Sequence, residues 1–131
     1  MQNMSGGKSA LGLDGNVTTA IGYLIGLVAL VLIFIEKDNK FVRYHAIQSV
    51  LYQVGLGVIL TIVGIVMVIL MFVVGMASSS LGVIVWILGM LVLFVVGLLW
   101  FGGMIYGAYK SYQGTEFKFP VIGNLADKWN K

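Results

Sequence analysis

The sequence predicts an all-α integral membrane protein with three transmembrane helices and short amphipathic helices at the membrane interface. The mean hydropathy over the 131 residues is +1.01, far above that of soluble globular domains. No charged residue occurs from Val17 to Ile35, and none occurs from Ala46 to Tyr109. A chain of this length could not bury so much apolar surface in a soluble core, so lipid is the expected solvent of these stretches.

Three segments are long enough to cross a bilayer as helices. Crossing roughly 30 Å of hydrocarbon takes about 20 residues. The uncharged sequence Ala-Ser-Ser-Ser separates the last two segments and predicts an antiparallel hairpin with a tight turn. The predicted single membrane domain comprises a polar tail (1–16), a span (17–35), a cytoplasmic loop and interfacial helix (36–53), a span (54–76), a turn (77–80), a span (81–109) and a cytoplasmic amphipathic tail (110–131).

The distribution of basic residues predicts the orientation of the three spans. Cytoplasmic loops of membrane proteins are enriched in Lys and Arg. With three spans, the N-terminal tail and the 77–80 turn share one side of the membrane, where Lys8 is the single base. The N-terminus is therefore predicted outside and the C-terminus inside. The predicted cytoplasmic side holds Lys37, Lys40, Arg43, Lys110, Lys118, Lys128 and Lys131.

The segment between the first two spans concentrates polar residues. Residues 36–40 predict a turn, and a helix is expected from Phe41 onward. At about 100° per residue this helix has a polar and an apolar side, which is typical of a helix at the membrane interface. The sequence leaves open whether it lies flat or continues into the second span. The polar side holds His45, Gln48, Ser49, Tyr52 and Gln53, and the apolar side holds Ala46, Ile47, Val50 and Leu51.

The C-terminal tail predicts a second interfacial helix on the same side of the membrane. Gly114 suits the end of the third span, and Pro120 suits the first turn of a new helix. In that helix Val121, Leu125 and Trp129 would share one apolar side. We expect it to rest against the membrane or against the first interfacial helix.

A polar site is predicted on the cytoplasmic side, where these two segments lie. His45 and Gln48 point the same way from their helix, and Glu36 is expected within reach of Arg43 or His45. The simpler interpretation is a juxtamembrane anchor whose basic side chains extend toward lipid phosphates. The alternative is a site that binds a partner or stabilises the fold. Its candidate residues are Glu36, Arg43, His45, Gln48, Tyr52, Tyr109 and Tyr112.

No catalytic residue, metal ligand or cofactor is predicted. The sequence places no second acid–base group or nucleophile beside His45, the one histidine, so an enzyme is not expected. Cysteine is absent and the acids are few and scattered, which disfavours a metal site. The net charge of +3 follows from the bases on the predicted cytoplasmic side, so a nucleic-acid partner is not expected either.

Glycines in the predicted spans indicate close helix packing. Small residues at four-residue spacing let helix backbones approach each other in lipid. The simpler interpretation is packing within one chain, and the alternative is an interface between copies of the chain. The packing candidates are Gly22, Gly26, Gly57, Gly64, Gly103 and Gly107.

Two motifs resemble a known family. EKDNKFVRYHAIQS at 36–49 and AYKSYQGTEFKFPVIGNLADKW at 108–129 resemble a group of small prokaryotic membrane proteins of unknown function. That group is considered distantly related to the membrane subunit of the chloroplast inner-envelope protein-import translocon. The resemblance implies a multi-pass protein of the prokaryotic cytoplasmic membrane. The matching positions are Glu36, Lys37, Phe41, Arg43, His45, Ala46, Gln48, Ser49, Ala108, Tyr109, Pro120, Ile122 and Gly123.

Three functions are compatible with these features. The first is a small membrane scaffold or assembly protein whose cytoplasmic face binds a protein partner or itself, with a link to protein translocation or insertion implied by the resemblance. The second is an oligomeric channel or pore for a small solute or polypeptide. The third, a lipid-modifying enzyme that acts through His45, has the least support. The expected partners are the lipid bilayer, a membrane or cytoplasmic protein, and further copies of the chain.

Overall fold

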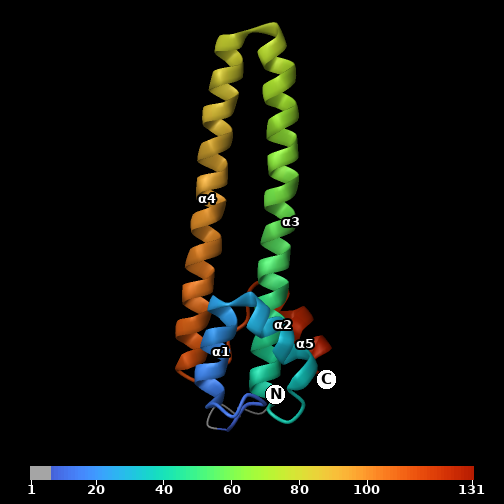
Figure 1. The fold of residues 1–131 in the computed structure, drawn as a ribbon, viewed down its shortest axis with the longest axis vertical. Coiled ribbons are helices and arrows are strands. Elements are labelled where there is room, and N and C mark those ends of the chain that lie inside the picture. Colours follow the sequence, from blue (N-terminus) through green and yellow to red (C-terminus); the bar gives the residue numbers. More distant parts are fainter. Residues whose placement is uncertain (1–6) are drawn as a thin grey trace. The chain divides into compact units, whose positions relative to one another are not determined.

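The computed structural model describes residues 7–131, and these residues fold into helices without a strand. The prediction of an all-α protein is therefore confirmed, and residues 1–6 of the predicted polar tail lie outside the described part. The chain divides into two compact units. Unit 1 comprises Met1–Gln53 and Gly102–Lys131, and unit 2 comprises Val54–Phe101. The helices, labelled in Figure 1, are α1 (Gly15–Leu24), α2 (Gly26–Ile35), α3 (Lys40–Ala77), α4 (Ser79–Tyr112) and α5 (Ile122–Trp129).

The expected first span, 17–35, is not a continuous helix. Helix α1 ends at Leu24, Ile25 has extended backbone angles (φ −123°, ψ 96°), and α2 begins at Gly26. The two helices pack against each other within unit 1 as a short hairpin (Figure 1). Each has 10 residues and is therefore about 15 Å long, which is half of a bilayer's hydrocarbon thickness.

Local interactions stabilise the helices of this folded-back segment. The Asp14 side chain accepts a hydrogen bond from the Asn16 N–H (2.9 Å) and caps α1. Gly22 packs against α2 at ordinary van der Waals distance, since an added Cβ would lie 3.6 Å from the Ala29 Cβ. A hydropathy average over the segment cannot detect the turn between the two helices.

Within residues 7–131, two helices are long and apolar enough to cross a membrane, α3 and α4. Helix α3 is continuous over 38 residues, so residues 41–53 continue into the helix that contains the predicted second span. The sequence had left this alternative open. The structure thus supports two candidate spans rather than the three that were predicted.

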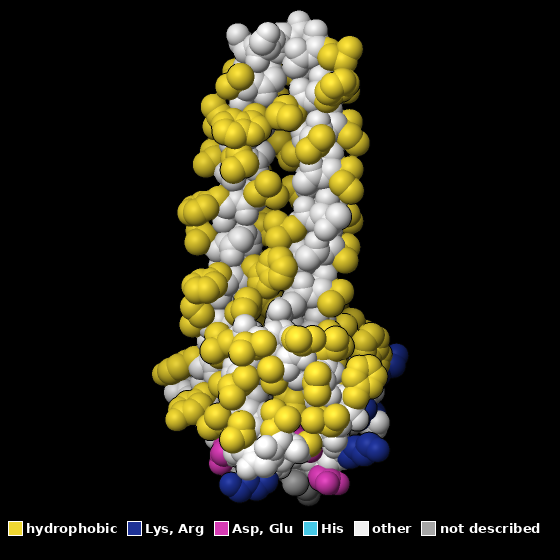
Figure 2. All heavy atoms as spheres, in the orientation of Figure 1, with side chains coloured by type: hydrophobic (Ala, Val, Ile, Leu, Met, Phe, Trp, Pro, Cys, Tyr) yellow, Lys and Arg dark blue, Asp and Glu magenta, His cyan; other side chains and the backbone are white. Residues whose placement is uncertain are grey.

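Unit 2 is the apolar part of the α3–α4 hairpin. Helix α3 ends at Ala77 and α4 begins at Ser79, within the predicted 77–80 turn. The Ser78 hydroxyl accepts a hydrogen bond from the Leu81 N–H at 3.3 Å. Near the turn the helices approach closely, because a Cβ on Gly82 would lie 2.9 Å from the Gly75 Cα. Hydrophobic side chains cover the visible face of this hairpin (Figure 2), as expected for a surface in contact with lipid.

The two packing candidates in unit 2 have different surroundings. An added Cβ at Gly57 would lie 3.9 Å from the Trp100 side chain, whereas one at Gly64 meets nothing within 4 Å. Gly64 instead borders an apolar groove of about 210 Å³ between the helices. Gly57 therefore packs against a side chain of the same chain, whereas Gly64 does not.

In unit 1, two glycines of α4 lie directly against tyrosine rings. A Cβ at Gly103 would overlap the Tyr52 hydroxyl, and a Cβ at Gly107 would lie 2.5 Å from the Tyr23 ring. Close contacts of this kind leave no room for even a methyl group. These two packing candidates thus have partners within the chain.

Gly107→Ala is expected to destabilise unit 1 by about 1–3 kcal/mol, because the methyl group must displace the buried Tyr23 ring. Gly102→Ala is the matched control, since a Cβ at Gly102 meets nothing within 4 Å and alanine favours helix by up to about 1 kcal/mol. Thermal unfolding in detergent measures both. Equal melting temperatures for the two variants would contradict the packing described.

Candidate functional site

The polar side of α3 predicted from the sequence faces the interior of unit 1. His45, Gln48 and Ser49 are almost fully buried, and Tyr52 is buried as well. The Ser49 hydroxyl donates to the Gly22 carbonyl at 2.9 Å and accepts from the Gln53 side chain at 3.1 Å. This part of α3 lies ahead of the apolar stretch that starts at Val54. Its polar residues therefore connect helices rather than face water.

Gln48 is the centre of a buried hydrogen-bond network. Its Nε2 donates to the Tyr23 hydroxyl (2.8 Å) and to the Phe117 carbonyl (3.2 Å). Its Oε1 accepts from the Tyr44 hydroxyl (3.2 Å) and from the Phe119 N–H (3.0 Å). One side chain thus joins α1, α3 and the segment that follows α4. We call Tyr23, Tyr44, His45, Gln48 and Phe117 the Gln48 cluster.

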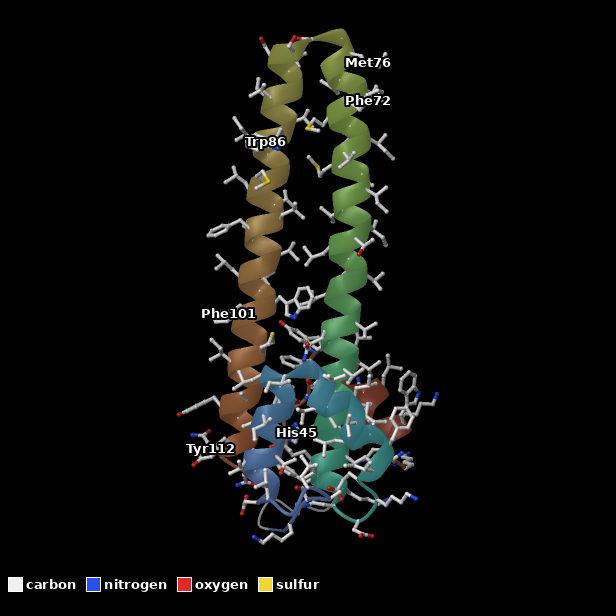
Figure 3. All side chains as sticks on the ribbon, viewed as in Figure 1. His45, Phe72, Met76, Trp86, Phe101 and Tyr112 are labelled. Atoms are coloured by element: carbon white, nitrogen blue, oxygen red, sulfur yellow. The ribbon has the colours of Figure 1, made fainter. Side chains whose placement is uncertain are left out.

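His45 is enclosed by aromatic rings. Its ring centroid lies 4.6 Å from that of Phe41, 5.2 Å from Tyr44 and 5.3 Å from Phe117. Its Nδ1 lies 2.8 Å from the Tyr23 hydroxyl. Because that hydroxyl accepts from Gln48, it donates its own hydrogen to Nδ1, and the neutral ring carries its hydrogen on Nε2. Figure 3 shows His45 within the body of unit 1.

Burial makes the charged form of this histidine unfavourable. It lowers the pKa of His45 from 6.5 to about 3, and the nearby backbone of Thr115 offsets a smaller part of the shift. Nε2 is buried without a hydrogen bond of normal geometry to any described residue. His45 is therefore neutral at physiological pH.

Residues 115–119, which we call the C-terminal strap, close the cluster. Helix α4 ends at Tyr112, and Gly114 adopts a positive φ of 77°. Hydrogen bonds from the Gly114 N–H to the Ser111 carbonyl (3.0 Å) and from the Thr115 N–H to the Lys110 carbonyl (3.1 Å) complete a glycine C-cap. The predicted role of Gly114 at the helix end is confirmed.

Two phenylalanines fix the strap to the helices. The Phe117 ring lies 5.7 Å from the Tyr23 ring, and the Phe119 ring stacks on Tyr52 with centroids 4.6 Å apart and an interplanar angle of 17°. Sequence reasoning did not select Tyr23, Tyr44 or either phenylalanine. The alternation Phe117-Lys118-Phe119 was the available signal, because it is typical of an extended segment with one apolar face.

The remaining predicted site residues lie apart from the Gln48 cluster. Glu36 is buried, but its carboxylate accepts hydrogen bonds from the Ala10 N–H (2.6 Å) and the Asn39 N–H (3.1 Å) and so fixes the turn before α3. Arg43 is partly exposed. Tyr109 and Tyr112 are 60% and 59% exposed, and Tyr112 lies at the edge of unit 1 (Figure 3). The structure thus joins His45, Gln48 and Tyr52 to the C-terminal tail through the strap.

Gly22 and Gly26, the two packing candidates of the first apolar segment, also contact residues within unit 1. Gly22 contacts α2, and an added Cβ at Gly26 would overlap the Gln53 side chain. Within residues 7–131, no group of three or more His, Cys, Asp or Glu side chains is placed to hold a metal ion. The arrangement is that of a structural core built from polar and aromatic side chains.

Comparison with known proteins gives a consistent picture of small membrane proteins. Residues 11–126 match the family described as the magnetosome magnetite crystal formation protein family. A UPF0132 membrane protein of Methanocaldococcus jannaschii is 36% identical over 126 residues, covering 95% of this chain and 96% of that protein. A second from the same organism is 31% identical, covering 92% of this chain and 73% of that protein.

A third UPF0132 membrane protein, from Archaeoglobus fulgidus, is 30% identical over 114 residues and covers 86% of this chain and 92% of that protein. No solved structure gives a significant match. The resemblance to small prokaryotic membrane proteins is confirmed at this level. Neither the family description nor the names of these relatives refers to a protein-import translocon, so that part of the resemblance stays a prediction.

Proposed function

We propose that this chain, which belongs to the magnetosome magnetite crystal formation protein family, is a membrane scaffold rather than an enzyme. The observation that carries this proposal is the Gln48 cluster. Its polar groups bond to one another and hold α1, α3 and the C-terminal strap together. A core of this kind fixes the shape of unit 1, which is the property that a scaffold needs.

The topology we propose has two spans, with both segments of unit 1 on the same side of the membrane. A hairpin of two spans returns the chain to the side from which it started. All eight basic residues of the sequence then lie on that side, because none occurs in residues 54–101. With three spans, seven of these basic residues lie on one side of the membrane and one lies on the other, so the two-span topology has the stronger bias. Because basic residues are enriched on the cytoplasmic side, we place unit 1 on that side.

The α1–α2 hairpin supports immersion of unit 1 in the membrane surface. Leu24, Ile25 and Leu27 at its turn are exposed, and so are Val31 and Phe34 farther along α2. Side chains of this kind are stable against hydrocarbon and costly in water. We infer that the hairpin enters the cytoplasmic leaflet without crossing the bilayer.

The polar surface of unit 1 is the part of the protein that would bind a protein partner or another copy of the chain. On the visible face, most of the charged side chains lie toward one end of unit 1 (Figure 2). Lys37, Asp38 and Lys40 are exposed at the turn before α3. This surface differs from the site expected from the sequence, since His45 and Gln48 are interior. A role in protein insertion or translocation is the narrower form of the proposal, and it rests on the resemblance of residues 36–49.

In-cell photocrosslinking tests the proposal. A photoreactive residue at Lys37 is expected to give a discrete protein adduct, while the same probe at Ser80, in the turn of unit 2, gives none of the same mass. The adduct from Lys37 should be lost with Gln48→Leu, which disrupts the core, and kept with Gln113→Leu, an exposed matched substitution. Adducts with lipid alone from Lys37 would refute partner binding.

The family description concerns magnetite crystal formation in magnetosomes, and the archaeal relatives are named as membrane proteins. A scaffold is compatible with both descriptions, because it requires a membrane and a binding partner but no reaction. The lipid-modifying reaction considered for His45 would need the ring to reach a substrate. In the folded chain that ring is enclosed by the aromatic side chains of Phe41, Tyr44 and Phe117.

A further inference from the structure

Helix α5 has three distinct sides. At about 100° per residue, its buried residues Gly123 and Ala126 fall on one side, and the buried C-cap residue Asn130 continues that side. This side packs on α3, where Ala126 joins Tyr44 and Ile47 in a small apolar cluster. The Asn130 side chain donates to the Lys40 carbonyl at 3.0 Å and fixes the end of α5 to the start of α3. The orientation of α5 in unit 1 is therefore well defined.

A second side of α5 is apolar and uncovered. Leu125 and Trp129 lie four residues apart on α5 and are 39% and 56% exposed, and Val121, the residue directly before the helix, is 72% exposed. The sequence predicted that the three residues share a side of one helix, and this holds for Leu125 and Trp129, whereas Val121 lies outside the helix with a positive φ. We call these three residues the α5 stripe.

The backbone directly in front of α5 is strained at Val121. Val121 has a positive φ of 64° with ψ −53°, and the Ile122 N–H bonds to the Pro120 carbonyl at 2.7 Å. This is a γ-turn with positive φ, which is rare and costly for a β-branched residue. Val121 at this turn is 72% exposed, and an exposed valine in water gives no energy that would offset the strain.

The third side of α5 is cationic and borders the stripe. Lys128 lies next to Leu125 on the helix surface, and Lys131 follows two residues after the helix ends at Trp129. Asp127, the one acid on the helix, is bonded to Lys118 at 3.3 Å. A cleft of about 180 Å³ beside the last turn is lined by Lys40, Asp127, Asn130 and Lys131. The charge next to the stripe is therefore net positive.

We propose that the α5 stripe binds the headgroup region of an anionic phospholipid bilayer, with Lys128 and Lys131 on the lipid phosphates. An apolar stripe containing Trp, bordered by lysines, is the pattern of an interfacial helix. Charge favours lipid over an apolar protein groove, because lysines at the border of the stripe match phosphates. The continuity of unit 1 with two candidate spans keeps it at the membrane surface, so no separate partner is needed. The inference goes beyond the scaffold proposal and does not depend on a protein partner.

Fluorescence of Trp129 tests the proposal in the full chain. Trp86→Phe with Trp100→Phe leaves Trp129 as the single tryptophan. In nanodiscs of phosphatidylcholine containing phosphatidylglycerol, we expect blue-shifted emission and strong quenching by lipids brominated near the carbonyl end of the acyl chain. The matched control carries Trp129→Phe with Asn124→Trp, which moves the probe to the polar side of α5. That probe should show water-like emission and little quenching.

The anionic preference has its own readout in the single-tryptophan protein. Brominated phosphatidylglycerol should quench Trp129 more than brominated phosphatidylcholine does. Lys128→Gln and Lys131→Gln should each reduce this preference by roughly fivefold, the effect of about 1 kcal/mol per base. Lys128→Arg and Lys131→Arg should preserve it. Water-like, unquenched emission from Trp129 would overturn the proposal, and equal quenching by the two lipids would overturn its anionic part.

Discussion

Gln48→Leu is expected to destabilise unit 1 by about 3 kcal/mol and to release the C-terminal strap. Leucine keeps the volume of the side chain but removes its four hydrogen bonds, each worth about 1 kcal/mol. The Phe119 N–H loses its acceptor, and the Tyr23 hydroxyl loses its donor. Burial of leucine recovers part of the loss, which is why the expected total is below the sum of the bonds.

Two measurements follow the effect of this variant. Thermal unfolding in detergent gives the change in stability, and hydrogen exchange gives the release of the strap, with faster exchange expected at the Phe119 amide. Gln113→Leu is the matched control, because Gln113 is exposed just beyond α4. An unchanged melting temperature and unchanged exchange at Phe119 in the Gln48 variant would contradict the role of Gln48 as the centre of the hydrogen-bond network.

Acidification from pH 7 to pH 4.5 is expected to destabilise unit 1 by about 2–3 kcal/mol through His45. The folded-state pKa of His45 is lowered to about 3, whereas that of an unfolded histidine is about 6.5. Between these values the unfolded chain binds a proton that the folded chain does not, so stability falls as the pH falls through this window. Above about pH 6.5 the contribution is constant.

His45→Gln separates this effect from the titration of the acids. The variant loses stability at neutral pH but keeps the acids, so the difference in unfolding free energy between the two proteins should shrink as the pH falls from 6.5 to 4.5. The measurement is denaturant or thermal unfolding at a series of pH values. Parallel pH profiles for the two proteins would show that His45 is not buried in its neutral form.

Much of the architecture follows from local sequence, because it depends on chemistry within a few residues. The all-helical class and the turn near Ala77 are set by hydropathy and by polar residues between apolar runs. The end of α4 follows from Gly114, which adopts the left-handed conformation that glycine favours. The shared side of Leu125 and Trp129 on α5 follows from their spacing of four residues in a helix.

The break of the first apolar segment could not be predicted in the same way. Nineteen uncharged residues satisfy the length of a span, and the packing of α1 against α2 that accompanies the turn at Ile25 is a tertiary contact. Hydropathy predicts that a segment contacts lipid, but it does not predict whether the segment crosses the bilayer or turns back. A short hairpin in one leaflet and a span have the same composition.

A functional role for the candidate site stays a prediction. Helical spacing grouped His45, Gln48 and Tyr52 on one side of α3, and the structure buries all three in unit 1. Their partners could not be found from spacing, since Tyr23 lies 25 residues before Gln48, and the Phe117 carbonyl belongs to a residue 69 positions after it. These distant partners are the reason that the polar side of α3 faces the interior of unit 1 and not water.

The measurement that tests the proposed two-span topology most directly is the accessibility of single cysteines, since the natural sequence has none. Lys8→Cys, Gln113→Cys and Ser80→Cys place thiols at exposed positions before α1, after α4 and at the turn of unit 2. Labelling of intact cells and of inverted vesicles with an impermeant maleimide should show positions 8 and 113 on the same side and position 80 on the other. Labelling of positions 8 and 80 from the same side would show that the first apolar segment crosses the bilayer and would contradict the account.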